Sequence, residues 1–113
     1  MATVEQCQQA FDALAARLAA VDEQTRRRNS LDRTLGCTLR DLGVAFSGRL
    51  KDGLLEDIHQ VDDASGAQVK LTMSSDDLLK LVAGELNLAS AWAGGRVKVD
   101  ARVLDLVKLR SIF

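Results

Sequence analysis

The sequence predicts an α+β domain in which helices cover one face of an antiparallel sheet. Three observations lead to this prediction. Residues 1–21 repeat their apolar positions with the period of a helix, residues 34–73 alternate apolar and polar side chains as strands do, and residues 74–113 return to helical spacing around one more alternating stretch. The length of 113 residues predicts one domain, 1–113, with a sizeable core.

The first predicted element is a long helix that begins after Thr3. Thr3 and Gln6 have the spacing of a capping box, in which each side chain accepts a hydrogen bond from the other residue's backbone N–H. A narrow apolar stripe follows at steps of three and four residues: Val4, Cys7, Phe11, Leu14, Leu18 and Val21. We interpret the run Arg26–Arg28 as a solvated helix end that suits the helix dipole, in preference to an anion contact.

Four strands are predicted next, each with one apolar face. Their ranges are 34–40, 44–50, 55–61 and 67–73. Leu35, Cys37 and Leu39 share one face of the first strand, and the pair Asp52–Gly53 predicts a hairpin between the second and third. Because short polar turns join the four strands, we expect an antiparallel meander. Its apolar face must be covered, and the helices are available to cover it.

A helix and a second, shorter helix are predicted after the fourth strand. Ser74 or Ser75 caps the first of them, and Gly84 is placed to end it. Asn87 caps the second.

The second short helix is expected to turn Trp92 inward just before Gly94–Gly95 reverse the chain. A fifth strand, 96–101, then alternates Val97 and Val99 on the core face with charged residues on the other.

A final helix is predicted from Arg102, and its apolar residues cover more than half of its circumference. Such a helix lies deep between other elements, packs against a second subunit, or separates the sheet from an apolar cavity. The pattern alone ranks these three explanations equally.

Composition and charge exclude several classes of function. The 15 Lys and Arg are balanced by 16 Asp and Glu, and aromatic residues make up 4%, which argues against nucleic acid as a partner. The N-terminus lacks the basic and apolar segments of a signal peptide, and no stretch approaches the ~18 apolar residues of a membrane span. Cys7 and Cys37 show no metal or redox spacing, so a reduced, cytoplasmic setting is expected.

Candidate catalytic groups are few, and we expect no enzyme activity. The one histidine, His59, lies in the least regular strand, and a dyad of His59 with Cys37 is the strongest catalytic hypothesis. Both cysteines are better interpreted as small buried hydrophobic residues. No metal-ligand cluster and no glycine-rich phosphate loop is present, so neither a metal nor a cofactor is expected.

The stretch 76-DDLLKLVAGELNLASAWAGGRVKVDARVLDLVKL-109 resembles the C-terminal signature of the sterol carrier protein family, type 2. The matching features are the G-E-L-N run Gly84–Asn87, the pair Ala91–Trp92, Gly95, the basic alternating strand Arg96–Val99 and the pair Lys108–Leu109. The segment 67-AQVKLTMSSDD-77 and the order of the upstream elements match as well, so the resemblance covers nearly the whole chain.

This resemblance implies a five-stranded, mostly antiparallel sheet with helices on one face and an apolar cavity between sheet and helices. Leu88 stands where the family often has proline, and Ala101 stands where a glycine usually ends the fifth strand, which removes a flexible joint before the last helix. The chain ends in Ser111–Phe113 in place of a peroxisomal S-K-L signal, as expected for a stand-alone bacterial or cytosolic member.

The resemblance also implies which residues line the ligand cavity. They come from the inner sheet face and from the helices: Phe46, Val69, Leu71, Met73, Leu78, Leu81, Val82, Trp92, Val97, Val99, Leu104 and Val107. The periodicity of these residues, taken alone, is better explained by a solid core, whereas the resemblance favours a cavity.

The implied function is non-catalytic binding and transfer of sterols, fatty acids or fatty acyl-CoA. The alternative is an interaction module with little or no cavity that forms a homodimer through its apolar C-terminal helix. The third and lowest-ranked hypothesis is an enzyme that uses His59.

A separate question within the lipid-binding hypothesis concerns Arg102, Lys108 and Arg110, which stand near apolar Ile112 and Phe113. These cations are interpreted as ordinary surface residues on a packed helix, in preference to a transient contact with an anionic membrane.

Overall fold

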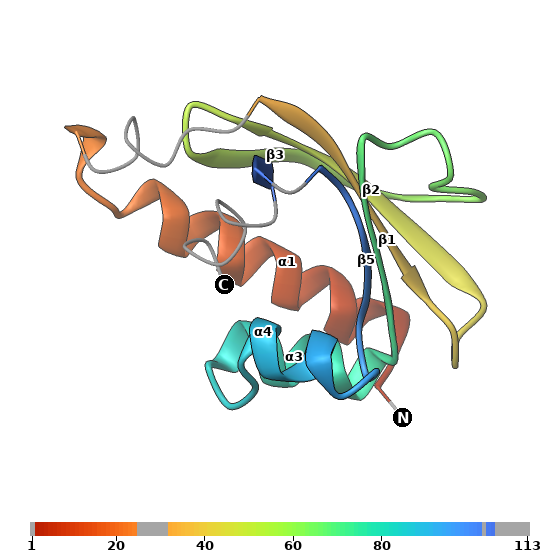
Figure 1. The fold of residues 1–113 in the computed structure, drawn as a ribbon. Helices are drawn as coiled ribbons and strands as arrows, with labels where there is room; N and C mark the ends of the chain where they lie inside the picture. The colour runs from red at the N-terminus through yellow and green to blue at the C-terminus, as the bar shows by residue number, and fades with distance from the viewer. Residues whose placement is uncertain (1, 25–31, 103, 106–113) are drawn as a thin grey trace.

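The structure, a computed structural model of the chain, describes residues 2–24, 32–102 and 104–105. Within these ranges, the helices α1, α3 and α4 lie on one side of a five-stranded sheet (Figure 1). The elements are α1 Val4–Ala19, β1 Arg33–Leu39, β2 Val44–Lys51, β3 Leu54–Val61, β4 Val69–Met73, α3 Ser75–Ala83, α4 Leu88–Ala93 and β5 Lys98–Asp100. Among the described residues, no helix has the length and apolar character needed to cross a membrane.

The strand order of the sheet is β3-β2-β1-β4-β5. β1 pairs with β2, β2 with β3, and β4 with β5 in antiparallel fashion, which confirms a mostly antiparallel sheet. The predicted four-strand meander is wrong at one step, because β4 pairs with β1 in parallel and does not lie beside β3. Beside β1, Val69, Leu71 and Met73 of β4 are each at most 2% exposed, so this placement buries the whole apolar face of β4.

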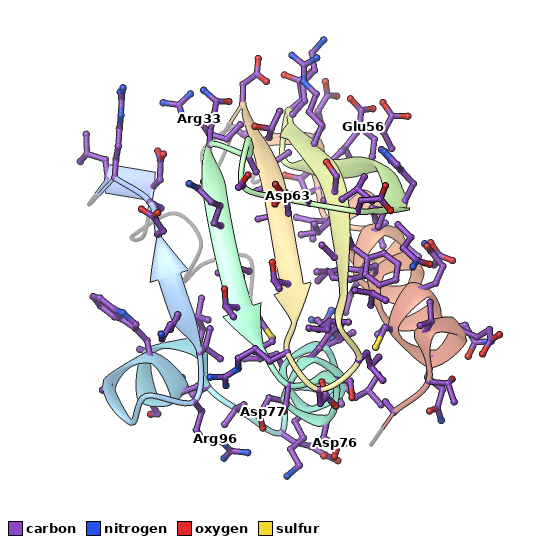
Figure 2. All side chains as sticks on the ribbon, turned by 90° about the vertical axis from the view of Figure 1, so that its right-hand side faces the viewer. Arg33, Glu56, Asp63, Asp76, Asp77 and Arg96 are labelled. Atoms are coloured by element: carbon purple, nitrogen blue, oxygen red, sulfur yellow. The ribbon has the colours of Figure 1, made fainter. Side chains whose placement is uncertain are left out.

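Because β4 lies beside β1 and not beside β3, the chain between β3 and β4 has to cross the sheet, and it does so on the face opposite the helices. Figure 2 views this face, with Asp63 of the crossing segment in front of the strands. The segment lies directly over Gly36 of β1. A Cβ atom at Gly36 would stand 2.8 Å from the Ala64 Cβ and 2.9 Å from both the Ala64 carbonyl oxygen and the Ala67 Cβ. Glycine is therefore required at position 36, because any side chain there would displace the crossing segment.

The inner sheet face packs against α1, which contacts β3 and α3. The Phe11 ring of α1 meets the Phe46 ring of β2 with their centroids 5.2 Å apart at an angle of 47°. The predicted stripe of α1 is confirmed at Cys7, Phe11 and Leu14, which are buried. Val21 lies beyond the end of the helix and is exposed.

The predicted helix caps are confirmed. The Thr3 hydroxyl accepts from the Gln6 N–H at 3.1 Å, and the Gln6 side chain accepts from the Thr3 N–H at 2.8 Å. Ser74 caps α3, which ends at Gly84 in the left-handed conformation with φ 79°. Asn87 caps α4 by accepting from the Ser90 N–H.

A polar junction joins the start of α3 to the turn between β1 and β2. The Asp41 carboxylate accepts hydrogen bonds from the backbone N–H of Ser75 at 2.9 Å and from its hydroxyl at 2.5 Å. The Ser75 hydroxyl in turn accepts from the Ala2 N–H at 3.0 Å. The hydrogen bond from the Ser75 hydroxyl is the largest cause that lowers the pKa of Asp41 below its ordinary value.

The segment after β5 is described at Arg102, Leu104 and Asp105. Asp105 is 4% exposed, and its carboxylate accepts from the Arg33 Nε at 3.2 Å, which ties this segment to the start of β1. Leu104 and Asp105 are helical, in the range of the predicted last helix. The rest of that helix at 103 and 106–113, and the run Arg26–Arg28, lie outside the described residues.

Replacing Gly36 with alanine is expected to destabilise the fold by about 1–3 kcal/mol, because its Cβ collides with backbone and Cβ atoms of the crossing segment. Gly66, which lies in the crossing segment itself, is the matched control, since a Cβ there would meet nothing within 4 Å. Gly66→Ala should leave stability unchanged or raise it by up to about 1 kcal/mol. Urea unfolding of both variants measures the difference, and equal stabilities would contradict the crossing described here.

Asp41→Asn is expected to lower the melting temperature at pH 7 and to lose this effect in acid. The folded pKa of Asp41 lies below its unfolded value, so its carboxylate contributes stability above the unfolded pKa of about 3.9. That contribution disappears as the pH falls through the folded pKa. Thermal unfolding from pH 7 to pH 2 should therefore show the gap to wild type closing below about pH 4. Glu56→Gln serves as control, because Glu56 is exposed and its substitution also removes one negative charge. A difference in melting temperature between Asp41→Asn and wild type that persists at pH 2 would refute this role of the Asp41 carboxylate.

Candidate functional site

Most residues predicted to line a cavity form a packed core. Eight of them are at most 8% exposed: Phe46, Val69, Leu71, Met73, Leu78, Leu81, Val82 and Val97. Val99 is half-buried, whereas Trp92 is 51% and Leu104 77% exposed. Val107 lies outside the described residues.

The space found between the sheet and α1 is too small for a lipid. It measures about 10 Å³ and lies beside Phe11, Cys37 and Phe46. A volume of this size holds about one water molecule. Among the described residues, side chains thus fill the interface between sheet and helices, and the predicted cavity is not seen there.

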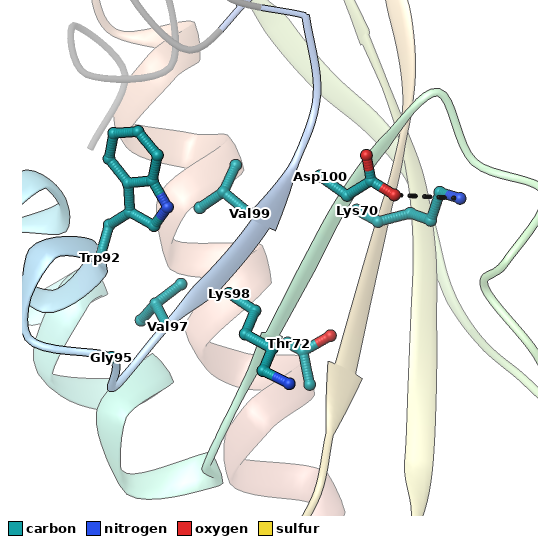
Figure 3. A pocket seen from close by; sticks show the side chains of 8 residues that line it. All are labelled: Lys70, Thr72, Trp92, Gly95, Val97, Lys98, Val99 and Asp100. Atoms are coloured by element: carbon teal, nitrogen blue, oxygen red, sulfur yellow. Dashed lines mark ion pairs between the residues drawn. The ribbon is translucent and has the colours of Figure 1, made fainter.

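Trp92 does not turn inward as its position at the end of α4 led us to expect. α4 turns Leu88 and Ala91 to the core, and the Ala91 carbonyl accepts from the N–H groups of Arg96 and Val97 at 2.9 and 3.2 Å. These bonds fold the chain back so that Val97 takes the interior position, at 1% exposure. The indole of Trp92 consequently lies outside, on the same side of β5 as Val97 and Val99 (Figure 3).

An open hollow of about 490 Å³ runs along β5 beside Trp92. Its lining comes from β4, from β5 and from the end of α4 with the turn that follows: Lys70, Thr72, Trp92, Gly95, Val97, Lys98, Val99 and Asp100. Figure 3 shows that the lining has two parts. Trp92, Val97 and Val99 form an apolar side, and the polar residues lie across the strand from them.

Charges on the polar side are partly paired. The Lys70 Nζ lies 3.5 Å from the Asp100 Oδ2. Lys98 is exposed, and within the described residues it forms no ion pair or hydrogen bond through its side chain. The polar side therefore carries one uncompensated positive charge.

A second ion pair holds the turn before β5 in place. The Arg96 guanidinium donates to the Asp77 carboxylate in the first turn of α3, and both residues are labelled at the lower end of Figure 2. Arg40, just after β1, donates from its Nη2 to the Arg96 carbonyl oxygen at 3.2 Å. These two contacts fix where β5 begins, and with it the position of the hollow.

Sequence reasoning did not include the polar lining among the site residues. The alternation of the fifth strand indicated that Lys98 and Asp100 face away from the core. Their partners Thr72 and Lys70 follow only from the pairing of β5 with β4, which no local pattern reveals. Once that pairing is known, the polar faces of the two strands are the signal that would have found the site.

The catalytic hypothesis of a His59–Cys37 dyad is not supported by the geometry. Burial raises the pKa of the Cys37 thiol to about 12, so a thiolate is disfavoured at neutral pH. Burial also raises the pKa of Cys7, with smaller effects of Asp41 and Asp76. His59 is exposed, and its Nδ1 lies 2.7 Å from the Asp57 carbonyl oxygen. In the described ranges no three His, Cys, Asp or Glu side chains gather as a metal site would need.

Comparison with sequence families gives one match over nearly the whole chain. The model of the alkyl sulfatase C-terminal family matches residues 2–113. Among curated proteins no match is found.

The solved structures similar to this chain include an alkylsulfatase and sterol carrier proteins. The stereoselective inverting sec-alkylsulfatase Pisa1 from Pseudomonas sp. is 26% identical, with a TM-score of 0.70. The match covers 91% of this chain and 15% of that enzyme, so the chain spans a small part of the sulfatase's length.

Sterol carrier proteins are also similar to this chain. Sterol carrier protein-2 from Aedes aegypti in complex with palmitate is 24% identical over 98% of this chain and 94% of that one, with a TM-score of 0.69. Sterol carrier protein 2 like 2 from the same species is 18% identical over 98% and 100% of the two chains, with a TM-score of 0.69. These matches confirm the sterol-carrier fold that the sequence predicts.

Proposed function

The chain belongs to the family of alkyl sulfatase C-terminal domains, and on this premise we propose that it binds single-chain alkyl amphiphiles without catalysing a reaction on them. The observation that carries the proposal is the hollow of about 490 Å³ along β5, where a half-exposed tryptophan lies beside Val97 and Val99. An exposed aromatic residue next to apolar strand residues and a polar margin is a recurrent feature of ligand sites.

Energetics support binding at this hollow. Each methylene group removed from water contributes roughly 0.8 kcal/mol, so a linear chain of eight to ten carbons offsets the cost of association without a specific polar contact. The volume is within the usual range of about 300–1,000 Å³ for small-molecule sites. By contrast, the space of about 10 Å³ in the core admits no alkyl chain unless the core opens.

Two kinds of relative support a linear alkyl ligand. One similar structure is a sec-alkylsulfatase, and another holds palmitate. The proposal therefore narrows the predicted sterols, fatty acids and acyl-CoA to ligands with a linear chain. For a sulfatase of this kind, we infer that the domain holds the alkyl part of a substrate and contributes nothing to hydrolysis.

The proposed setting is the cytoplasm, since Cys7 and Cys37 are free and buried. The alternative of a homodimer through the C-terminal helix rests on residues 106–113 and stays a prediction, because these lie outside the described residues.

Titration with decanoate below its micelle concentration is expected to change the fluorescence of Trp92, the one tryptophan of the chain, in a saturable manner. Val99→Asp should weaken binding at least about tenfold, because a carboxylate beside the alkyl chain loses solvation. Val44→Asp is the matched control: Val44 is likewise a half-buried strand valine packed on the core, but it does not line the hollow.

Circular dichroism checks that both variants fold, and the milder pair Val99→Thr and Val44→Thr replaces them if either does not. An unchanged Trp92 signal with wild-type protein, or equal weakening by the two aspartates, would count against the proposal.

A further inference from the structure

The polar side of the hollow is built from facing residues of β4 and β5. In the antiparallel register Thr72 stands opposite Lys98, and Lys70 stands opposite Asp100. The pair between them, Leu71 and Val99, belongs to the other face of the sheet, because successive strand residues alternate faces. The four polar side chains thus form one continuous patch on the face opposite the helices (Figure 3).

Charge is unevenly distributed over this patch. Lys70 is paired with Asp100 at 3.5 Å, and Arg96, the next cation along the chain before Lys98, is paired with Asp77. Lys98 has no such partner within the described part of the chain. An ammonium group offers three donors and no acceptor, and the Thr72 hydroxyl beside it can also donate. This end of the hollow is therefore suited to a compact group that accepts hydrogen bonds and carries negative charge.

The apolar side of the same hollow begins one residue away. Val97 and Val99 flank Lys98 along the chain, and Trp92, at the end of α4, lies on the same side of β5 as both valines. A molecule that satisfies both sides has an alkyl chain along Trp92 and Val99 and a charged end that reaches across the β5 edge to Lys98. An uncharged end would leave the lysine with water only, and a cationic end would be repelled.

We propose that the hollow selects amphiphiles with a compact anionic head, a carboxylate or a sulfate, which Lys98 and Thr72 hold while Asp100 restrains Lys70. This inference rests on the proposed function and adds the chemistry of the head group. Lys70 is a second cation that can contact the head group, because its ion pair with Asp100 is exposed and therefore weak. Removing the Asp100 charge is therefore predicted to strengthen the binding of anions.

The experiment compares four ligands that share a ten-carbon chain: decanoate, decyl sulfate, decan-1-ol and decyltrimethylammonium, each below its micelle concentration. Trp92 fluorescence gives the affinity of the wild-type protein for each. The two anions should bind roughly fivefold or more tightly than the alcohol, and the ammonium ligand most weakly. The advantage of the anions should shrink between about 0.01 M and about 1 M salt, where the Debye length falls from about 30 to about 3 Å.

Two variants locate the head group. Lys98→Gln should reduce the affinity ratio of decyl sulfate to decan-1-ol roughly fivefold, and Asp100→Asn should raise that ratio severalfold. Lys51→Gln and Asp52→Asn are the matched controls, since both residues are exposed in the distant β2–β3 hairpin and repeat the same charge changes. Comparison of decanoate with decyl sulfate distinguishes the two head groups. If Lys98→Gln fails to fold, the test is the salt dependence of the affinity ratio of decyl sulfate to decan-1-ol in the wild-type protein.

The outcomes separate the two proposals. Equal affinity for the anions and the alcohol, with no effect of Lys98→Gln or of salt, would overturn the head-group inference and leave alkyl binding intact. No response of Trp92 to any of the four ligands would overturn both. Ratios that change in the Lys51 and Asp52 controls as much as in the Lys98 and Asp100 variants would attribute the selectivity to net charge and would also overturn the inference.

Discussion

The parallel pairing of β4 with β1 is the contact on which the rest of this structure depends. It requires the chain to cross the sheet, and the crossing segment lies on the outer face, where Gly36 has no side chain. It also places β4 between β1 and β5, so that β5 forms the edge of the sheet and α4 lies beside that edge. The hollow between Trp92 and the polar residues of β4 and β5 is a consequence of that arrangement.

The packed core moves the proposed ligand site from the interior to the edge of the sheet. Phe11 and Phe46 pack against each other between α1 and the sheet, and the space beside them measures about 10 Å³. The fold is shared with sterol carrier proteins, yet similarity of fold at this level of identity does not carry the position of a ligand. The side chains along β5 favour a separate site at the sheet edge, in which an apolar part and a cationic part lie next to each other.

Local features of the sequence were sufficient for the elements, and less so for their pairing. Thr3, Ser74 and Asn87 cap helices through bonds that span three residues, so pattern alone identifies them. The partner of β4 could not be found in this way, because the turn after β3 is compatible with either neighbour. Trp92 was misplaced for a similar reason: whether it or Val97 fills the interior depends on how the chain folds back onto Ala91. The resemblance to a family supplied the architecture that periodicity left open.

Backbone chemical shifts followed by NMR during titration with decanoate test most directly where the ligand binds. Binding along β5 predicts that the amide signals of Thr72, Gly95 and Val99 move with one common affinity, while those of Phe11, Cys37 and Phe46 stay in place. Shifts confined to Phe11, Cys37 and Phe46 would show that the alkyl chain enters the core between α1 and the sheet, and would contradict a site at the sheet edge.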